Sequence, residues 1–415
     1  MGRAVLLLAA LALAGSSSAA AKPRTLVVGN ANGFAHAAAK LRRTGGTIVL
    51  RPGAYASLAL GPRSRRTLRV VGDGGVRVGR FLLARTQHVE IGHLRIGPVT
   101  GDASLELDGA SSIDLHDLTV DAEGTSYQAS IFIASAHGVD IRRSVFTHCG
   151  DHSPDFANCI LLNRGAHSVT IDHNSFHDCH GCDFIHGRFG SWLTIRNNRF
   201  DRALPCHHIT SYRCRHNDLV QLFAGQWLRV ERNHFGVYRA GGAQLYLTDD
   251  VDHATVVNNV FVGTDPELPG YRARVAIVLG AKGSKRLPYY AKVVNNTILT
   301  GYRRRDGYLG SIRMSSAYGS VRLWKRPIIA NNVIALLGSH WPVCATAQQF
   351  LANVVITGIN CQQDGYVGDP ELDARGHPQP ESILVGAANR DLAPPVDYTG
   401  RRRDADPDVG AYELR

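Results

Sequence analysis

The chain has 415 residues, including 43 glycines and 17 prolines, and carries a formal net charge of +11 at pH 7. It is long enough to bury one extended core, and the near absence of long helical patterns excludes a mainly helical fold. A basic balance favours acidic partners, such as uronic-acid polysaccharides, anionic cell-wall polymers or nucleic acid, or it is simply a solvated surface. No RNA-binding or DNA-binding motif accompanies it, so we expect no nucleic-acid partner.

Residues 1–21 have the three parts of a secretory signal peptide. Arg3 precedes an apolar run from Ala4 to Ala14, and small residues from Ser16 to Ala21 lead to Lys22. The apolar run is too short to span a bilayer stably, and no second candidate follows. We therefore expect an exported, extracellular, soluble protein without a membrane partner, and we expect a monomer.

Residues 22–60 are predicted to form an N-terminal cap. Apolar residues and alanines follow a helical spacing from Gly33 to Arg43, and Gly45 and Gly46 end that pattern. The first strand follows at residues 47–50. A short amphipathic helix in this position would cover the open end of a stacked structure.

A short phrase returns seven times: an apolar residue, any residue, an apolar residue, two polar residues, a marker residue and, two places on, Phe or Ile. The markers are Ser144, Asn174, Asn198, Asn233, Asn259, Asn296 and Asn332. They are 24 to 37 residues apart, by subtraction of their numbers. A variable period of this size is typical of a solenoid that keeps its strands on one side and accepts insertions on the other.

The alternation within each unit points one apolar row inward. This row contains Ile171, Ile195, Val230, Val256, Val293 and Ile329. Stacked about 4.8 Å apart, such rows become columns through a core. Asn suits the corner that follows, because it tolerates the left-handed conformation and its amide can bond to the Asn of the next coil. The pattern predicts an all-β, single-stranded, right-handed parallel β-helix over residues 61–358.

Eight cysteines in an exported chain indicate disulfides. Cys149 and Cys179 lie five residues after consecutive markers, so they could bridge adjacent coils. Three further pairs are candidates: Cys159 with Cys182, Cys206 with Cys214, and Cys344 with Cys361. The alternative is a zinc site built on Cys179 and Cys182, with His173 and His177 nearby.

Two neighbouring coils carry polar residues where the others do not. Asp183 and Asp218 lie fifteen residues before their markers, and His186 and Gln221 lie three residues later. We expect each pair to be about one strand spacing apart and to face outward. Around them cluster His180, Arg188, His207, His208, Arg213, Arg215 and His216. Two close carboxylates repel each other, so either a cation joins them or one has a raised pKa.

Trp192 and Trp227 both lie six residues before their markers, so they are predicted to stack on the same two coils. Exposed, they would form a platform for sugar rings; buried at a corner, they would only pack on one another. Beyond Asn353 the repeats fade. Residues 359–415 are rich in Pro, Gly and Asp, and are predicted to form an irregular C-terminal cap.

The sequence resembles the pectate-lyase-like superfamily of right-handed parallel β-helix proteins. Residues 44–55 (TGGTIVLRPGAY) are similar to the usual entry into that helix, and residues 406–413 (DPDVGAYE) resemble an ending common in secreted bacterial members. The resemblance implies the fold. It leaves the function open, because the superfamily includes lyases, hydrolases, epimerases and proteins without known activity.

Three functions suit the polar coils. In a polysaccharide lyase, Asp183 and Asp218 would hold Ca²⁺ against a uronate carboxylate while Arg188, Arg215 or a nearby His abstracts the adjacent proton. We place catalysis on Asp183, His186, Arg188, Arg215, His216 and Asp218, and substrate binding on Gln221, His208, Trp192 and Trp227. An acidic-glycan lyase is the first hypothesis.

The second hypothesis is a glycoside hydrolase in which Asp183 and Asp218 act as acid and as nucleophile or base. The hydrolase pattern of the superfamily is absent, and only fragments such as His216-Asn217-Asp218 and Asp249-Asp250 remain. The third hypothesis is a non-catalytic glycan-binding or surface protein. A purely structural reading has the two Asp side chains capping the turns that enter their strands.

Overall fold

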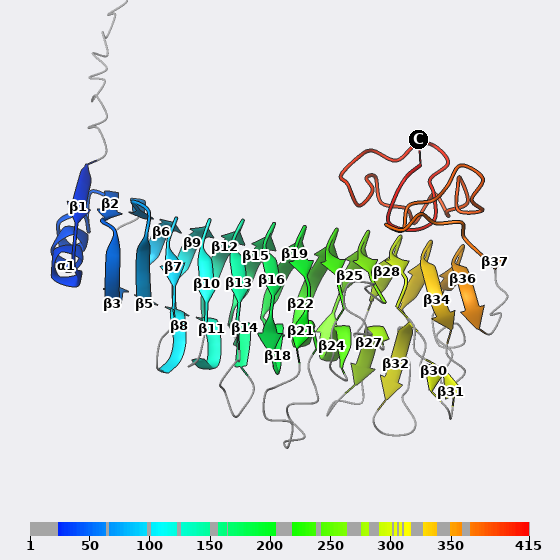
Figure 1. Ribbon diagram of the computed structural model, residues 1–415, viewed down its shortest axis with the longest axis horizontal. Coiled ribbons are helices and arrows are strands. Elements are labelled where there is room, and N and C mark those ends of the chain that lie inside the picture. Colours follow the sequence, from blue (N-terminus) through cyan, green and yellow to red (C-terminus); the bar gives the residue numbers. More distant parts are fainter. Residues whose placement is uncertain are drawn as a thin grey trace, which may run out of the picture.

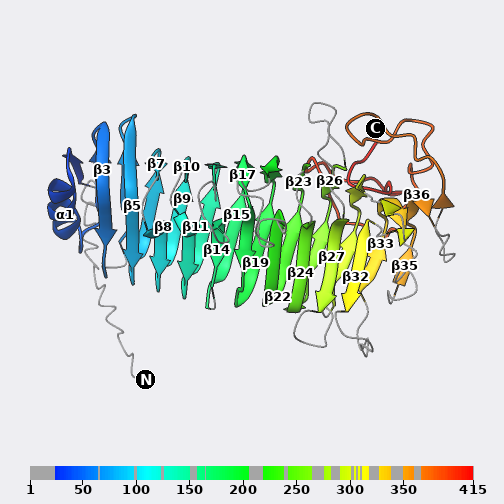
Figure 2. The same ribbon diagram turned by 60° about the horizontal axis from the view of Figure 1, so that its bottom comes forward.

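The computed structural model describes residues 24–63, 66–97, 101–122, 126–149, 157–163, 165–204, 218–237, 242–263, 275–281, 290–300, 303–304, 307–308, 311–316, 327–337, 349–358 and 366–414. Within these ranges the chain forms a long rod of strands with a helix at one end (Figure 1). Successive coils pair in parallel, and Figure 2 shows their strands side by side along the rod. The predicted parallel β-helix is confirmed.

The strands form three parallel sheets, named here first, second and third. The first sheet contains β1 (Thr25–Val28), β2 (Gly46–Leu50), β4 (Leu68–Gly72), β6 (Gln87–Gly92), β9 (Ser111–His116), β12 (His137–Arg142), β15 (His167–Asp172), β19 (Ser191–Arg196), β22 (Val220–Glu231), β25 (Thr255–Val257), β28 (Lys292–Val294), β33 (Ile328–Ala330) and β35 (Gln349–Leu351). The second sheet contains β3 (Gly53–Leu60), β5 (Val76–Ala84), β7 (Arg95–Ile96), β10 (Thr119–Asp121), β13 (Val145–Thr147), β16 (Ser175–His177), β20 (Arg199–Phe200), β23 (His234–Phe235), β26 (Val260–Phe261), β29 (Thr297–Ile298), β34 (Val333–Leu337), β36 (Val354–Gly358) and β37 (Tyr366–Val367).

The third sheet begins in the second halves of β3 and β5. It continues through β8 (Gly101–Asp108), β11 (Ser126–Ala134), β14 (Ala157–Leu162), β18 (Cys182–Gly187), the first half of β22, β24 (Ala243–Asp252), β27 (Val275–Ala281) and β32 (Ile312–Ser316). Two short pairs stand apart: β17 (Cys179–His180) with β21 (Ala203–Leu204), and β30 (Arg303–Arg304) with β31 (Gly307–Tyr308). Strand β22 runs through a corner and so belongs to two sheets.

The core is built of columns that run along the rod. The predicted inward row is buried, with at most 1% exposure at each of its six residues. The phenylalanines that follow the markers form a second column. Their rings stack from Phe146 through Phe176, Phe200 and Phe235 to Phe261, with centroids 4.5 to 5.1 Å apart. Burial of such aromatic side chains dominates the stability of a core of this kind.

The marker residues form a continuous hydrogen-bonded ladder. The backbone N–H of each donates to the side-chain oxygen of the next marker, from Ser144 to Asn353, at 2.9 to 3.0 Å. The expectation that the marker Asn adopts the left-handed conformation is wrong. That conformation belongs to the residue before it, such as His173 or Asn258, with φ of 54° and 53°. The marker itself is buried, since its side chain must reach the neighbouring coil.

Helix α1 (Ala31–Lys40) covers the N-terminal end of the rod, as the sequence predicts. Asn30 caps it by accepting a hydrogen bond from the Gly33 N–H at 2.8 Å. Phe34 and Ala37 face the first coils, and Phe34 meets Phe81 edge-on at 5.8 Å. The helix therefore shields apolar side chains that no further coil covers.

The C-terminal segment, residues 366–414, folds back along the side of the rod, above the corner between the first and second sheets (Figure 1). Asn258, Asn295 and Asn331 donate hydrogen bonds to its backbone from successive coils. The predicted irregular character agrees with its few strand residues. Its position against the side of several coils was not foreseen.

Candidate functional site

The two aspartates of the polar coils lie on adjacent coils at a corner of the third sheet. The Asp218 N–H donates to Asp183 Oδ1 at 2.7 Å, so the predicted one-strand separation is confirmed. The expectation that they face outward is wrong, because Asp183 is 2% and Asp218 1% exposed. Asp218 Oδ1 in turn accepts from the Ala243 N–H of the following coil. Both carboxylates satisfy backbone donors at a turn, which is the structural role considered above.

His186 connects the buried Asp183 carboxylate to the surface of the protein. Its Nδ1 lies 2.5 Å from Asp183 Oδ2, and its side chain is 22% exposed. A carboxylate can only accept, so Nδ1 holds the proton and Nε2 of the neutral ring has a free lone pair. Gly187 follows with φ of 131°, and a Cβ there would collide with the Leu162 carbonyl oxygen. The backbone next to His186 is thus fixed by a residue that must be glycine.

Arg188 and Phe223 complete a compact group with His186. The His186 ring meets the Phe223 ring edge-on at 5.0 Å, and the Arg188 guanidinium lies 5.1 Å from the centre of the same ring. No acidic side chain within the described ranges pairs with Arg188. A cation held on an aromatic ring beside an oriented imidazole is suited to receive an anionic ligand.

Gln221 lies directly beside His186, because β18 and β22 pair in register, but it is only 8% exposed, so the expectation that it faces outward is wrong. On the other side His186 pairs with Leu161, and Gln221 pairs with Tyr246. Alignment on the markers alone places Leu162 and Leu247 there, so that assignment is wrong by one residue. The coils differ by one residue in the number of residues between this strand and the marker. For β22 and β24 the extra residue lies at the register shift between Phe223 and Gly225.

Trp192 and Trp227 stack as predicted, with centroids 5.1 Å apart and planes 7° from parallel, and both are exposed. The stack continues onto His253 and Tyr290, at 4.1 and 4.6 Å. The sequence analysis missed these two residues. They lie six residues before Asn259 and Asn296, so the same offset that identified the tryptophans would have found them.

Three predicted site residues, His208, Arg215 and His216, lie outside the described residues. The same holds for the signal peptide and for Cys206, Cys214, Cys344 and Cys361. The structure thus brings Asp183, His186, Arg188, Asp218 and Gln221 together on two coils, with the two tryptophans at the next corner of the same coils.

The cysteine pairing differs from the expectation. Cys149 bonds to Cys159 and Cys179 bonds to Cys182. Cys149 and Cys179 occupy equivalent places on successive coils, where parallel side chains point the same way and their Cβ vectors do not converge. Cys159 does lie close to Cys182, as expected. The zinc alternative stays a prediction: Cys179 and Cys182 are bonded to each other, and His173 and His177 are not in the group of possible metal ligands that contains them.

Metal-ligand clusters within the described ranges do not include the two aspartates. One contains Cys159, Cys179 and Cys182, and the other His93, His116 and Asp117. Both oxygens of Asp183 already accept hydrogen bonds, from Asp218 and from His186. This donor set does not fit a calcium ion, which needs several free oxygens. The Ca²⁺ site stays a prediction, and no step below depends on it.

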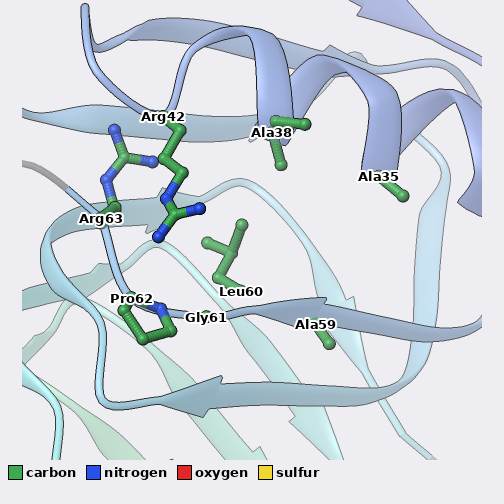
Figure 3. Close-up of a pocket in the computed structure, with 9 residues that line it drawn as sticks. Ala35, Ala38, Arg42, Ala59, Leu60, Gly61, Pro62 and Arg63 are labelled. Carbon is green, nitrogen blue, oxygen red and sulfur yellow. The ribbon is translucent and has the colours of Figure 1, made fainter.

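Two hollows lie elsewhere on the surface. One, of about 280 Å³, is enclosed by α1 and the end of β3, with Arg42 and Arg63 above alanine, leucine and proline side chains (Figure 3). The other, of about 430 Å³, is lined by residues that include Arg77, His93 and Asp117. Neither contains a predicted site residue. Across the described ranges, no helix is long and apolar enough to cross a membrane.

Comparison with known families decides the handedness of the coil. The family described as "Right handed beta helix region" matches residues 82–267. The match covers less than half of the chain and agrees with the parallel coils that the structure shows on both sides of it. The chain therefore has the predicted right-handed parallel β-helix fold, the fold that its resemblance to the pectate-lyase-like superfamily implies. A search of curated proteins finds no match.

Solved structures with a similar course of the chain share little sequence with it. Pectate lyase Pel9A is 11% identical, with 95% of this chain and 97% of that chain covered and a TM-score of 0.48. An alginate lyase from Paenibacillus sp. str. FPU-7 is 12% identical (71% and 98% covered, TM-score 0.46). ORF18 of Geobacillus virus E2 is 11% identical (72% and 57% covered, TM-score 0.46), so the β-helix protein spans just over half of that chain.

Proposed function

We propose that this β-helix protein is an exported lyase that cleaves an acidic polysaccharide by β-elimination, with His186 as the base. The observation that carries the proposal is the Asp183–His186 pair: a buried carboxylate 2.5 Å from Nδ1 of a partly exposed imidazole. Such a pair holds the ring in one orientation and stabilises the imidazolium that forms when Nε2 takes a proton.

The reaction needs a base and a cation close together. The proton next to the uronate carboxylate is acidic only if the negative charge that develops on that carboxylate is stabilised. Arg188 supplies a guanidinium without an acidic partner among the described residues, and this guanidinium and the His186 ring both contact Phe223. When Nε2 removes the proton, the C–H electrons form a double bond, the glycosidic C–O bond breaks, and the departing oxygen takes a proton from water, after which the imidazolium returns its proton to solvent.

Gln221, although mostly buried, has an amide beside His186 that is suited to bind a sugar hydroxyl. Trp192, which stacks on Trp227 on the same two coils, offers aromatic surface for a further sugar ring. The hydrolase alternative is less well supported. Its acid and its nucleophile would be Asp183 and Asp218, whose carboxylates are buried and bonded to backbone N–H groups. Export rests on the sequence features of residues 1–21.

The test is incubation of the protein with polygalacturonate, alginate and glycosaminoglycans. We expect ultraviolet absorbance from an unsaturated uronide with one of them. Replacing His186 by Ala removes the base and should lower kcat by about 10² to 10⁴-fold. Asp183→Asn keeps an oxygen for the Asp218 N–H but no longer fixes the ring tautomer, and should also lower kcat. Arg188→Ala should raise KM and lower kcat.

His173→Ala is the matched control, because this exposed histidine lies at another corner of the preceding coil and pairs with Asp172. It should leave activity unchanged. New reducing ends without the ultraviolet signal would point to hydrolysis. Binding of a polymer without either signal would make the protein a glycan-binding module. Full activity in His186→Ala would remove the proposed base.

A further inference from the structure

Four aromatic rings, three of them exposed and that of His253 partly buried, form a ladder along one corner of the rod, here called the ring ladder. It contains Trp192, Trp227, His253 and Tyr290, each from the next coil, with centroids 4.1 to 5.1 Å apart. All four residues have left-handed backbones, with φ of 61°, 62°, 52° and 51°. The corner itself imposes this conformation, because the earlier coils have Ser168, Gly138 and Ser112 there, also at positive φ.

Tryptophan is an unusual choice at such a corner. A bulky residue is uncommon in the left-handed region, which costs any residue with a Cβ about 1 to 2 kcal/mol relative to glycine. The earlier coils show that Gly, Ser and His make the same turn. Two tryptophans side by side, both exposed, therefore need an explanation other than the geometry of the turn.

The rings of the ladder do not present their faces equally. Trp227 lies between Trp192 and His253, and His253 lies between Trp227 and Tyr290, so both faces of each are covered. Trp192 stacks on a single ring, that of Trp227, within the described residues. At 58% it is the most exposed large apolar side chain of the described ranges. One face of its indole therefore remains open.

The open face of Trp192 is directed along the rod, toward coils that carry small residues at the same corner. The register of β15 and β19 places Ser168 at the position of Trp192 on the preceding coil, and the register of β12 and β15 places Gly138 there one coil earlier. The exposed Ser168 leaves the space of one ring above it, about one strand spacing deep. His167 borders this space, with its Nδ1 3.4 Å from Ser168 Oγ, and stacks on His137.

We infer that the open face of Trp192, above Ser168 and Gly138, is a stacking subsite for one pyranose ring of a saccharide chain. The apolar face of the sugar would continue the ring ladder by one step, while Ser168 and His167 offer hydrogen-bonding groups to its hydroxyls. The inference rests on the polysaccharide partner proposed above, but not on catalysis. It predicts that Trp192 contributes far more to saccharide binding than the other rings of the ladder.

The test measures binding of oligosaccharides in the His186→Ala protein, so that no substrate is consumed. The probes are trimers of galacturonate, of mannuronate and guluronate, and of a neutral glucan, followed by calorimetry and by tryptophan fluorescence. We expect at least one trimer to bind. Trp192→Ala should weaken that binding about tenfold. Tyr290→Ala, at the far end of the ladder, should change it less than about twofold.

Ser168→Gln provides the second arm, because a longer polar side chain fills the space and leaves Trp192 in place without adding a new aromatic face. His88 occupies the same corner of an earlier coil with φ of 54°, so a larger polar side chain is accepted there and the melting temperature should stay close to the parent value. The variant should lose binding as fully as Trp192→Ala. Equal losses in Trp192→Ala and Tyr290→Ala, unchanged binding in Ser168→Gln, or no binding of any trimer by the parent would overturn the inference. Binding without elimination activity would contradict only the proposed lyase reaction.

Discussion

The charged neighbours of single corner residues influence how the stability of the fold changes with pH. Asp117 has a left-handed backbone, with φ of 52°. Arg143 donates to its two carboxylate oxygens at 3.0 and 2.8 Å, and His116 Nδ1 lies 2.7 Å from Oδ2. The Arg143 hydrogen bonds are the main reason that the pKa of Asp117 is well below its usual range, and His116 adds to the effect.

This shift predicts a contribution to acid unfolding. Because the folded-state pKa is depressed, the ionised group stabilises the fold above the unfolded pKa of about 4, and this stabilisation is lost as pH falls. The melting temperature should therefore drop more between about pH 6 and about pH 3 in the parent than in Asp117→Asn. Asp140→Asn, which removes an exposed carboxylate nearby, should behave like the parent. Equal pH profiles for the parent and Asp117→Asn would contradict the assignment.

Among the elements, the ladder of markers ties one coil to the next. Asn233 is fully buried, and its side chain forms hydrogen bonds with the coils on both sides of its own. Its Nδ2 donates to the Ile195 carbonyl at 2.8 Å and to Asn259 Oδ1 at 3.0 Å, while its Oδ1 accepts from Asn198. The net stabilisation from such a hydrogen bond is modest, but removing one partner is costly, because the other donor or acceptor then stays buried without a hydrogen bond.

Asn233→Ala should therefore lower the free energy of unfolding by about 3 kcal/mol or more, because it leaves buried donors and acceptors of both neighbouring coils unpaired. Urea denaturation measures the change. Asn197→Gly is the matched control at the left-handed position before the previous marker, where glycine is favoured. It should cost less than about 1 kcal/mol. Similar losses in the two variants would show that the ladder contributes nothing beyond an ordinary corner.

For the whole molecule, a buried ion pair within the C-terminal segment helps to hold that segment against the rod at Asn258. The Arg403 guanidinium lies 2.7 Å from Glu413 Oε2, 3.1 Å from Asn258 Oδ1 and 2.8 Å from the Gly410 carbonyl oxygen. Burial lowers the pKa of Arg403 and raises that of Glu413. The ending at residues 406–413 thus serves to attach the segment to the side of the rod.

Replacing Arg403 by Met should release this segment, since Glu413 would then be buried without its cation, at a cost of about 3 to 5 kcal/mol. Limited proteolysis should cut residues 366–414 faster while the rod stays intact. Arg402→Met, at the exposed neighbouring position, should be cut like the parent. Equal protection of Arg403→Met and the parent would mean that apolar contacts alone hold the segment.

The sequence by itself determined the coil, the inward columns, the marker ladder, the capping helix and the stacking of the two tryptophans. Apart from the helix, which its own apolar spacing predicts, these features repeat at a set distance from a marker, and a parallel stack converts that distance into contact. The closeness of Asp183 and Asp218 followed in the same way.

The tertiary structure decided what the period does not encode. It buried both aspartates against backbone N–H groups, made His186 the surface member of the pair, and placed Arg188 on Phe223. It also set the disulfide partners and laid the C-terminal segment along the rod. These outcomes depend on the course of the corners between strands, where one residue more or fewer changes which side chain turns inward and which backbone donor needs an acceptor.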